Sequence, residues 1–183
     1  MIRTIYVYGS PVLRQMCHDI QPDYPDLQQL LVDMWETMRK SDGVGLAAPQ
    51  IGLPIRLFVI DASSFADQQP ELAGFQRTFI NAHILERFDG EYAFNEGCLS
   101  LPGVHEDVRR PASIRMQWVD EEFVPHEEVF TGITARIIQH EYDHIDGRLF
   151  IDLISPMRRR MLQGKLKNMS RGRFSASYPC RVG

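Results

Sequence analysis

The stretch "QHEYDHIDG", residues 139–147, carries two histidines four positions apart with a glutamate beside the first. Residues four apart on a helix lie one above the other on the same face, so His140 and His144 can bind one metal ion together. An isoleucine-rich segment, residues 133–138, precedes the motif and predicts that this helix lies in the core. Buried histidines beside a carboxylate need polar partners or an ion, because unpaired polar groups are costly in an apolar interior. The motif therefore predicts a core helix that holds a metal.

The sequence around this helix predicts an α+β domain. Apolar residues recur at helical spacing over residues 25–40, and the apolar run "LFVI" predicts a buried strand at residues 56–61. Further strands are expected near residues 78–85, 113–119 and 122–130. The helix with the histidines is expected from Thr131 to about Asp146, with Thr131 as its N-cap and Gly147 as its stop. We expect mixed or antiparallel sheets packed around this central helix.

No repeat or linker divides the chain, so we expect one catalytic domain over residues 1–183. Residues 63–74, "SSFADQQPELAG", read as a polar surface loop. A basic C-terminal helix and tail occupy about residues 156–183, and the last segment, "RFSASYPCRVG", is expected to form an edge strand or to stay irregular. Pro156 opens the helix, whose buried side is predicted to consist of Met157, Met161, Leu162 and Leu166.

Composition limits the class of protein. The 183 residues are 44% hydrophobic, enough for one core, and no stretch of about 18 apolar residues predicts a membrane span. The N-terminus lacks the pattern of a secretory signal, and three scattered cysteines do not form a disulfide framework. We therefore expect a cytoplasmic protein and neither a membrane nor DNA as its partner.

Charge is distributed unevenly along the chain. The net charge is −4, but no acidic residue follows Asp152, whereas eight lysines and arginines do. The rest of the chain has 12 basic and 24 acidic side chains. A basic C-terminal region indicates either an anionic partner such as RNA or a solvated helix face whose cations favour the C-terminal end.

The third metal ligand has to be found outside the motif. Zinc proteases with this motif take their third ligand, a glutamate or histidine, from downstream of the second histidine. Neither residue type follows His144 here, so the downstream candidates are only Asp146, Asp152 and Cys180. Asp146 lies about 200° around the helix from His144 and points away from it. Spacing does not exclude Asp152 or Cys180, although neither has a recognisable ligand context.

Cys98, upstream of the motif, is the favoured third ligand. It lies in "NEGCLSLPG", where Gly97 and a Pro102–Gly103 turn let the backbone bend close to an ion. One thiolate and two imidazoles leave one position open in a tetrahedral site for zinc or ferrous iron. The alternative for Cys98 is a small buried residue, the interpretation that suits Cys17 and Cys180.

A glycine-rich loop, "GVGLAAPQ" at residues 43–50, superficially matches a dinucleotide-binding fingerprint. That fingerprint requires a strand before it and a helix after it, whereas here a helix precedes and prolines follow. Small residues instead allow a substrate backbone to approach closely, and Gln50 can supply an amide donor.

"GVGLAAPQ", "EGCLS" and "QHEYDHIDG", in this order, resemble the three signature motifs of peptide deformylase, and the resemblance extends over residues 3–165. It departs from the family pattern at Ile145, where leucine is usual, in the loop at residues 62–75, and in the tail after Asn168. The resemblance implies one divalent ion, ferrous iron with zinc as the alternative. In this resemblance the ion's ligands are Cys98, His140 and His144, and the general acid/base is Glu141. The two oxyanion donors are the Gln50 side chain and the backbone N–H of Leu99. Gly45 contacts the substrate backbone.

The implied reaction is removal of the formyl group from the N-terminal formyl-methionine of a nascent peptide, with release of formate. Ile133 and Ile137 are expected either to line the methionine pocket or to serve only in core packing. Glu96 and Arg110 are expected either to pair and brace the Cys98 loop or to form an ordinary surface ion pair. The resemblance adds weight to a transient ribosome contact through the basic C-terminal region. The alternatives are a zinc endopeptidase of the His-Glu-x-x-His type and a non-catalytic binding module stabilised by a metal.

Overall fold

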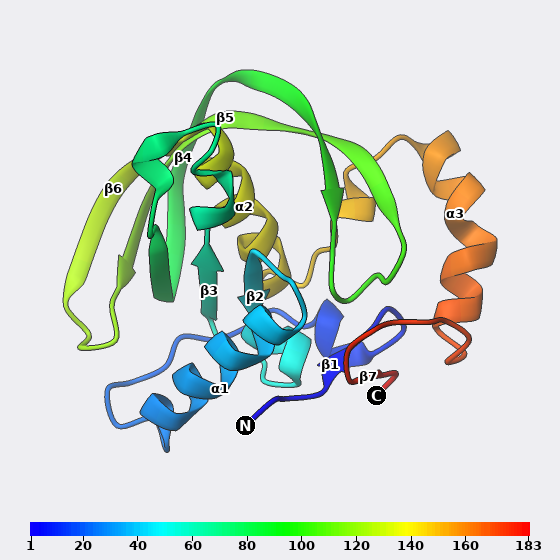
Figure 1. Ribbon diagram of the computed structural model, residues 1–183, viewed down its shortest axis with the longest axis horizontal. Helices are drawn as coiled ribbons and strands as arrows, with labels where there is room; N and C mark the ends of the chain where they lie inside the picture. The colour runs from blue at the N-terminus through cyan, green and yellow to red at the C-terminus, as the bar shows by residue number, and fades with distance from the viewer.

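The computed structural model describes residues 1–183 and contains one five-stranded antiparallel sheet in the order β2-β3-β4-β5-β6 (Figure 1). These strands span Gly45–Ala47, Leu57–Asp61, Gln76–Gly97, His105–Val119 and Pro125–Thr131. A second, two-stranded sheet pairs β1 (Ile5–Tyr6) with β7 (Cys180–Arg181) in parallel. The predicted α+β class is confirmed, and the C-terminal tail does add an edge strand.

The helix that carries the histidines, α2 (Gly132–Ile145), is the central helix of the fold. It packs against β2, β3, β5 and β6 and is buried along nearly its whole length. On β3, Phe58 and Ile60 join the cluster around α2, whereas Leu57 and Val59 join the cluster around α1 (Leu27–Lys40). Helices therefore cover both faces of the strand, which explains why its sequence is continuously apolar.

Both ends of α2 lie where the sequence predicted them. Thr131 occupies the N-cap position with extended backbone, although its side chain makes no capping hydrogen bond. After the C-cap residue Asp146, Gly147 adopts φ +70°, and the N–H of Arg148 donates to the Asp143 carbonyl at 2.8 Å. Glycine suits this position because left-handed backbone is costly for residues with a Cβ atom.

Strands β4 and β5 are far longer than the sequence pattern indicated. The predicted ranges, 78–85 and 113–119, cover the ends that pack around α1 and α2. In the first half of β5, Val108 is buried between the buried charged residues Glu106 and Arg110, so this part lacks an apolar alternation. Beyond Ile84 most of β4 is exposed, and register shifts interrupt its pairing with β5, so the apolar alternation that marks a half-buried strand is lost. The two strands arch over the top of the molecule (Figure 1), and β4 carries the chain to Cys98.

The remaining segments follow the predictions with local differences. β6 begins three residues later than expected, because the Asp120 carboxylate accepts the N–H groups of Glu122 and Val124 and forms a turn. The polar loop contains two 3₁₀ turns, η3 (Ser63–Phe65) and η4 (Pro70–Leu72). Three further 3₁₀ turns lie at Pro11–Arg14, Ala48–Ile51 and Phe150–Asp152, labelled η1, η2 and η5. No helix is both long and apolar enough to cross a membrane.

The predicted buried face of the last helix, α3 (Pro156–Met169), is partly wrong. Met157 and Met161 are 71% and 70% exposed, whereas Leu166 and Met169 are buried. Arg158 lies on the inner side of the first turn, where its guanidinium pairs with the buried Glu106 carboxylate at 2.8 Å. The side of α3 that faces the protein therefore begins at Arg158 and not at Met157, one residue later than predicted.

The end of α2 generates a stability prediction. A Cβ atom on Gly147 would lie 2.8 Å from the Arg14 carbonyl oxygen, in addition to the cost of left-handed backbone, about 1–2 kcal/mol. We expect Gly147→Ala to lower the free energy of unfolding in urea by about 2 kcal/mol or more. The control is Gly164→Ala in α3, where a Cβ meets open space and should stabilise the helix by about 0.5–1 kcal/mol. Equal stability of Gly147→Ala and the parent protein would contradict this explanation.

Candidate metal centre

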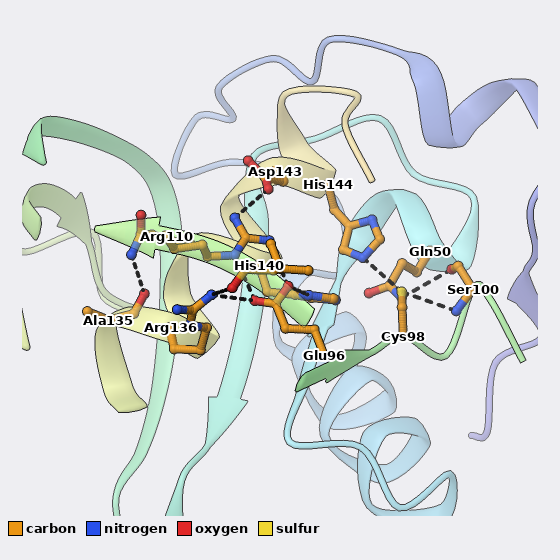
Figure 2. A network of polar contacts seen from close by, with 12 residues as sticks. Gln50, Glu96, Cys98, Ser100, Arg110, Ala135, Arg136, His140, Asp143 and His144 are labelled. Carbon is orange, nitrogen blue, oxygen red and sulfur yellow. Dashed lines mark hydrogen bonds and ion pairs between the residues drawn. The ribbon is translucent and has the colours of Figure 1, made fainter. Parts of the chain in front are cut away.

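Three side chains that can bind a metal lie together in the structure. The sulfur of Cys98 and one ring nitrogen from each of His140 and His144 lie within 4.8 Å of one another. The Cys98 Sγ is 3.2 Å from the His144 Nε2, and Figure 2 shows the two side chains pointing toward each other. The cysteine comes from the loop after β4, and both histidines come from α2. The spatial grouping expected from the sequence is therefore present.

The downstream candidates are engaged elsewhere. The Asp146 carboxylate accepts a hydrogen bond from the Arg56 guanidinium at 2.9 Å. The Asp152 carboxylate accepts the Leu149 N–H at 2.9 Å and pairs with Arg14. Cys180 lies in β7 and is not part of the cluster. Of the two candidates that spacing left open, Asp152 is thus excluded by its ion pair with Arg14 and Cys180 by its position in β7.

The Cys98 sulfur receives two N–H groups from neighbouring residues. The Ser100 backbone N–H donates to the sulfur at 3.4 Å, and the Gln50 Nε2 donates to it at 3.6 Å (Figure 2). Donors of this kind stabilise negative charge on sulfur, the form of cysteine that binds metals.

The amide of Gln50 is fixed in one orientation. Its Oε1 accepts the Ala47 N–H at 2.9 Å, and its Nε2 also donates to the Ser100 hydroxyl at 3.1 Å. The side chain is buried in η2, immediately after β2. Because the oxygen is already occupied, the N–H₂ group is the end that faces the sulfur.

The buried carboxylate of Glu96 connects β4 to α2. Arg110 donates to both of its oxygens, at 2.7 and 3.0 Å, and Arg136 lies 3.4 Å from Oε1 (Figure 2). Its Oε2 is 3.5 Å from the His140 Nδ1, which leaves the opposite ring nitrogen for a metal. Burial raises the Glu96 pKa, but hydrogen bonds from His140 and Arg110 outweigh it and lower the pKa to about 2. The predicted pair of Glu96 and Arg110 is confirmed, and it is buried.

The two histidines differ in their electrostatic surroundings. Burial, with a contribution from His140, lowers the His144 pKa well below its usual value and favours the neutral imidazole. Burial also lowers the pKa of His140, but the neighbouring Cys98 and Glu96 outweigh it and raise the pKa well above the usual value. Groups that favour positive charge at this position also favour a metal cation.

Glu141 has the surroundings of a proton-transfer group. Its carboxyl is buried, and its Oε2 has no hydrogen-bond partner. Burial raises the Glu141 pKa to about 7. Gly45 on β2 lies against this carboxyl so closely that a Cβ atom there would overlap it. A carboxyl with a pKa near neutrality can both accept and donate a proton.

These features fit a divalent metal ion. One thiol and two imidazoles form the donor set, and three protein ligands leave a coordination position for water or substrate, as in catalytic sites. The Glu141 Oε2, which has no partner in the protein and lies beside this donor set, could accept a hydrogen bond from water or substrate. A closed structural site would instead supply a fourth protein ligand.

A pocket of about 390 Å³ opens from this cluster, within the range of small-molecule sites. The N–H of Leu99 has no hydrogen-bond partner in the protein. His144 does not line this pocket, although its Nε2 lies 3.2 Å from the Cys98 sulfur. The other residues singled out from the sequence line the pocket: Gly45, Gln50, Cys98, Leu99, Ile133, Ile137, His140 and Glu141.

Sequence reasoning missed several residues of the site. The Ser100 side chain accepts from Gln50, and its place inside "EGCLS" was a usable signal. Phe94 and Arg136 line the pocket, and the Arg136 guanidinium lies 5.7 Å from the Phe94 ring centroid. Tyr178 also lines it, but the tail that carries this residue shows no motif that would reveal it.

Comparisons with known proteins agree with this geometry. The family model described as Polypeptide deformylase matches residues 2–160. A peptide deformylase of Flavobacterium johnsoniae is 51% identical over 185 residues, covering 97% of this chain and 94% of the relative. One from Cytophaga hutchinsonii is 48% identical over 178 residues, covering 97% and 96%. The crystal structure of peptide deformylase from Thermus thermophilus has a TM-score of 0.83 at 37% identity, covering 94% of this chain and 99% of that one.

Sequence, fold and donor set thus lead to the same assignment, and they favour it over both an endopeptidase and a binding module. The chain belongs to the polypeptide deformylase family of enzymes.

Proposed function

We propose that the chain hydrolyses the formyl group from N-formyl-methionyl peptides and releases formate, with one divalent ion held by Cys98, His140 and His144. The observation that carries this proposal is the thiol and imidazole cluster at the pocket, with the Glu141 carboxyl beside it. Family membership supports the reaction class.

We assign ferrous iron as the native ion, with zinc as the alternative. The mixed sulfur and nitrogen donor set suits both metals, so the preference for iron rests on the family resemblance. The chemistry that a bound divalent ion supplies is Lewis acidity, which polarises a carbonyl and lowers the pKa of water toward neutrality.

Glu141 is proposed as the general acid/base. Its carboxylate accepts the proton of the attacking water and then delivers it to the departing amine nitrogen. Burial supports this role, because it brings the pKa to about 7 and leaves one oxygen without a partner. Proton transfer by a positioned side chain typically contributes about 10²–10⁴ in rate.

Gln50 and Leu99 are proposed as donors to the oxyanion that develops on the formyl oxygen. The Gln50 Nε2 faces the Cys98 sulfur, and the Leu99 N–H has no partner within the protein. Removing one such donor costs about 2.7–4 kcal/mol of transition-state stabilisation in comparable sites.

The substrate itself is proposed to lie along β2 and α2. Gly45 would meet its backbone, and the lack of a side chain there also makes room for Glu141. Ile133 and Ile137 would contact the methionine side chain. Both line the pocket and also belong to the core cluster around α2, so each contributes to packing as well.

The basic C-terminal region is proposed to make a transient contact with the ribosome, where formylated chains emerge in the cytoplasm. Several of its cations are committed within the protein: Arg158 pairs with Glu106, Arg159 pairs with Asp152, and Lys165 donates to a carbonyl. Arg181 donates to the Tyr6 hydroxyl and lies over the Tyr6 ring. The side chains of the four remaining exposed cations have neither an ion pair nor a hydrogen bond with the protein: Arg160, Lys167, Arg171 and Arg173. These four are the ones that can contact phosphates.

The direct test of the proposed function compares two substrates. We expect formate release from formyl-Met-Ala and no cleavage of internal bonds in an unformylated peptide of several residues. Formate is quantified by a coupled dehydrogenase, and peptide fragments are identified by mass spectrometry. Internal cleavage without formate release would show an endopeptidase instead.

Two substitutions separate proton transfer from metal binding. Glu141→Gln keeps the size of the side chain but removes the base, so we expect kcat to fall by about 10²-fold or more at full metal content. Cys98→Ala removes a ligand, so metal content and activity should fall together. Elemental analysis and formate release are measured on the same samples. Full occupancy in Cys98→Ala would refute the ligand assignment.

Charge neutralisation tests the ribosome contact. Changing all four unpaired cations of the C-terminal region to glutamine should weaken co-sedimentation with ribosomes about tenfold or more at low salt and spare hydrolysis of formyl-Met-Ala. The matched control changes four exposed cations elsewhere to glutamine: Lys40, Arg77, Arg87 and Arg148. Equal sedimentation of both variants and the parent protein would rule the contact out.

A further inference from the structure

We propose that Tyr178, supplied by the C-terminal tail, is a positioning residue for the Cys98 sulfur and acts through the peptide unit that joins Leu99 to Ser100. The inference rests on the proposed function, because it assigns Cys98 as a metal ligand. It concerns a part of the chain where the three sequence motifs give no information.

The hydroxyl of Tyr178 is bonded to the backbone beside the ligand. It donates to the Leu99 carbonyl oxygen at 2.7 Å. The N–H of the same peptide unit, that of Ser100, donates to the Cys98 sulfur at 3.4 Å (Figure 2). One peptide group therefore receives a hydrogen bond from Tyr178 at one end and gives a hydrogen bond to the sulfur at the other.

All three carbonyls of the Cys98 loop are held in this way. The Cys98 carbonyl accepts the Leu101 N–H at 2.9 Å, and the Ser100 carbonyl accepts the Tyr8 N–H at 2.9 Å. Tyr178 holds the middle carbonyl, and it is the one side chain among the three donors. With the carbonyls held by these donors, the Ser100 N–H is directed to the sulfur, and the N–H of Leu99 is left without a partner.

The position of Tyr178 is fixed by the strand that follows it. The carbonyls of Pro179 and Arg181 accept the N–H groups of Ile5 and Val7, both at 2.9 Å, in the parallel pairing of β7 with β1. The terminal N–H of Gly183 donates to the Ser10 hydroxyl at 2.9 Å. In Figure 1 the red C-terminal segment runs back past β1. The tail is thus held as a strap against the first residues of the chain.

The Tyr178 hydroxyl keeps the proton that it donates to the Leu99 carbonyl. The side chain is half-buried at the edge of the pocket, and burial raises the Tyr178 pKa, so the phenol stays protonated. A hydrogen bond to a carbonyl polarises the peptide group and strengthens the bond that its N–H makes. Loss of the hydroxyl should therefore weaken the N–H bond to sulfur and leave the sulfur more electron-rich. Partners that orient a metal ligand in this way typically affect metal affinity or activity 10–100-fold.

The test compares Tyr178→Phe with Tyr6→Phe. Both changes delete one phenol hydroxyl from the unit formed by β1 and the tail. The Tyr6 hydroxyl bonds only to Arg181, away from the Cys98 loop. Each variant is loaded with Co²⁺, its sulfur-to-cobalt charge-transfer band is recorded, and the rate of Co²⁺ release to EDTA is measured, together with kcat and KM for formyl-Met-Ala.

We expect Tyr178→Phe to shift the charge-transfer band to lower energy, because the sulfur becomes more electron-rich. We also expect it to release Co²⁺ about three- to tenfold faster, with kcat reduced and KM unchanged, because the Leu99 carbonyl is no longer held and the sulfur is less firmly positioned. Tyr6→Phe should match the parent protein in every measurement. An unchanged band and release rate in Tyr178→Phe would overturn the inference, and so would equal changes in both variants, which would indicate general loosening of the tail. Absence of formate release by the parent protein would instead refute the proposed function, because the cobalt measurements do not depend on turnover.

Discussion

The buried carboxylate of Glu96 is the interaction on which the site depends. It lies two residues before Cys98 on β4, and it contacts Arg110 on β5 and both Arg136 and His140 on α2. Arg110 in turn donates to Asp143 on α2 at 2.7 Å. Breaking a buried ion pair by removing one partner typically costs about 3–5 kcal/mol, because the other charge is left uncompensated. The same carboxylate therefore joins strand to helix and turns the His140 ring toward the sulfur.

Several structural features become intelligible from this constraint. The long strands β4 and β5 arch over the molecule (Figure 1). The ion pairs of Glu96 and Arg110 with α2 hold the end of β4 and the start of β5 against this helix. On the other side of the pocket β2 passes close to Glu141, and only glycine at position 45 leaves room for the carboxyl. The chain ends then brace the loop from the other side through Tyr8 and Tyr178.

The sequence predicted the features that depend on local periodicity or on motif context. Both α1 and α2 were recognisable because their apolar faces repeat at helical spacing, and Gly147 marked the end of α2. Cys98 was favoured because no downstream residue had a ligand context. The unpredicted features depend on long-range contacts. The ion pair of Arg158 with Glu106 set the inner face of α3. The exposed half of β4 has no apolar alternation, and in the first half of β5 two of the buried positions are the charged residues Glu106 and Arg110. The reach of Tyr178 into the pocket follows from the pairing of β7 with β1.

The central claim is that the cluster of Cys98, His140 and His144 binds one divalent ion on which formate release depends. Its most direct measurement is an anaerobic titration of metal-free protein with Fe²⁺, in which bound metal and formate release are followed on the same sample. The account predicts that activity rises in proportion to bound metal and reaches its maximum at one ion per chain. Full activity without metal, or a maximum reached only well beyond one ion per chain, would contradict it.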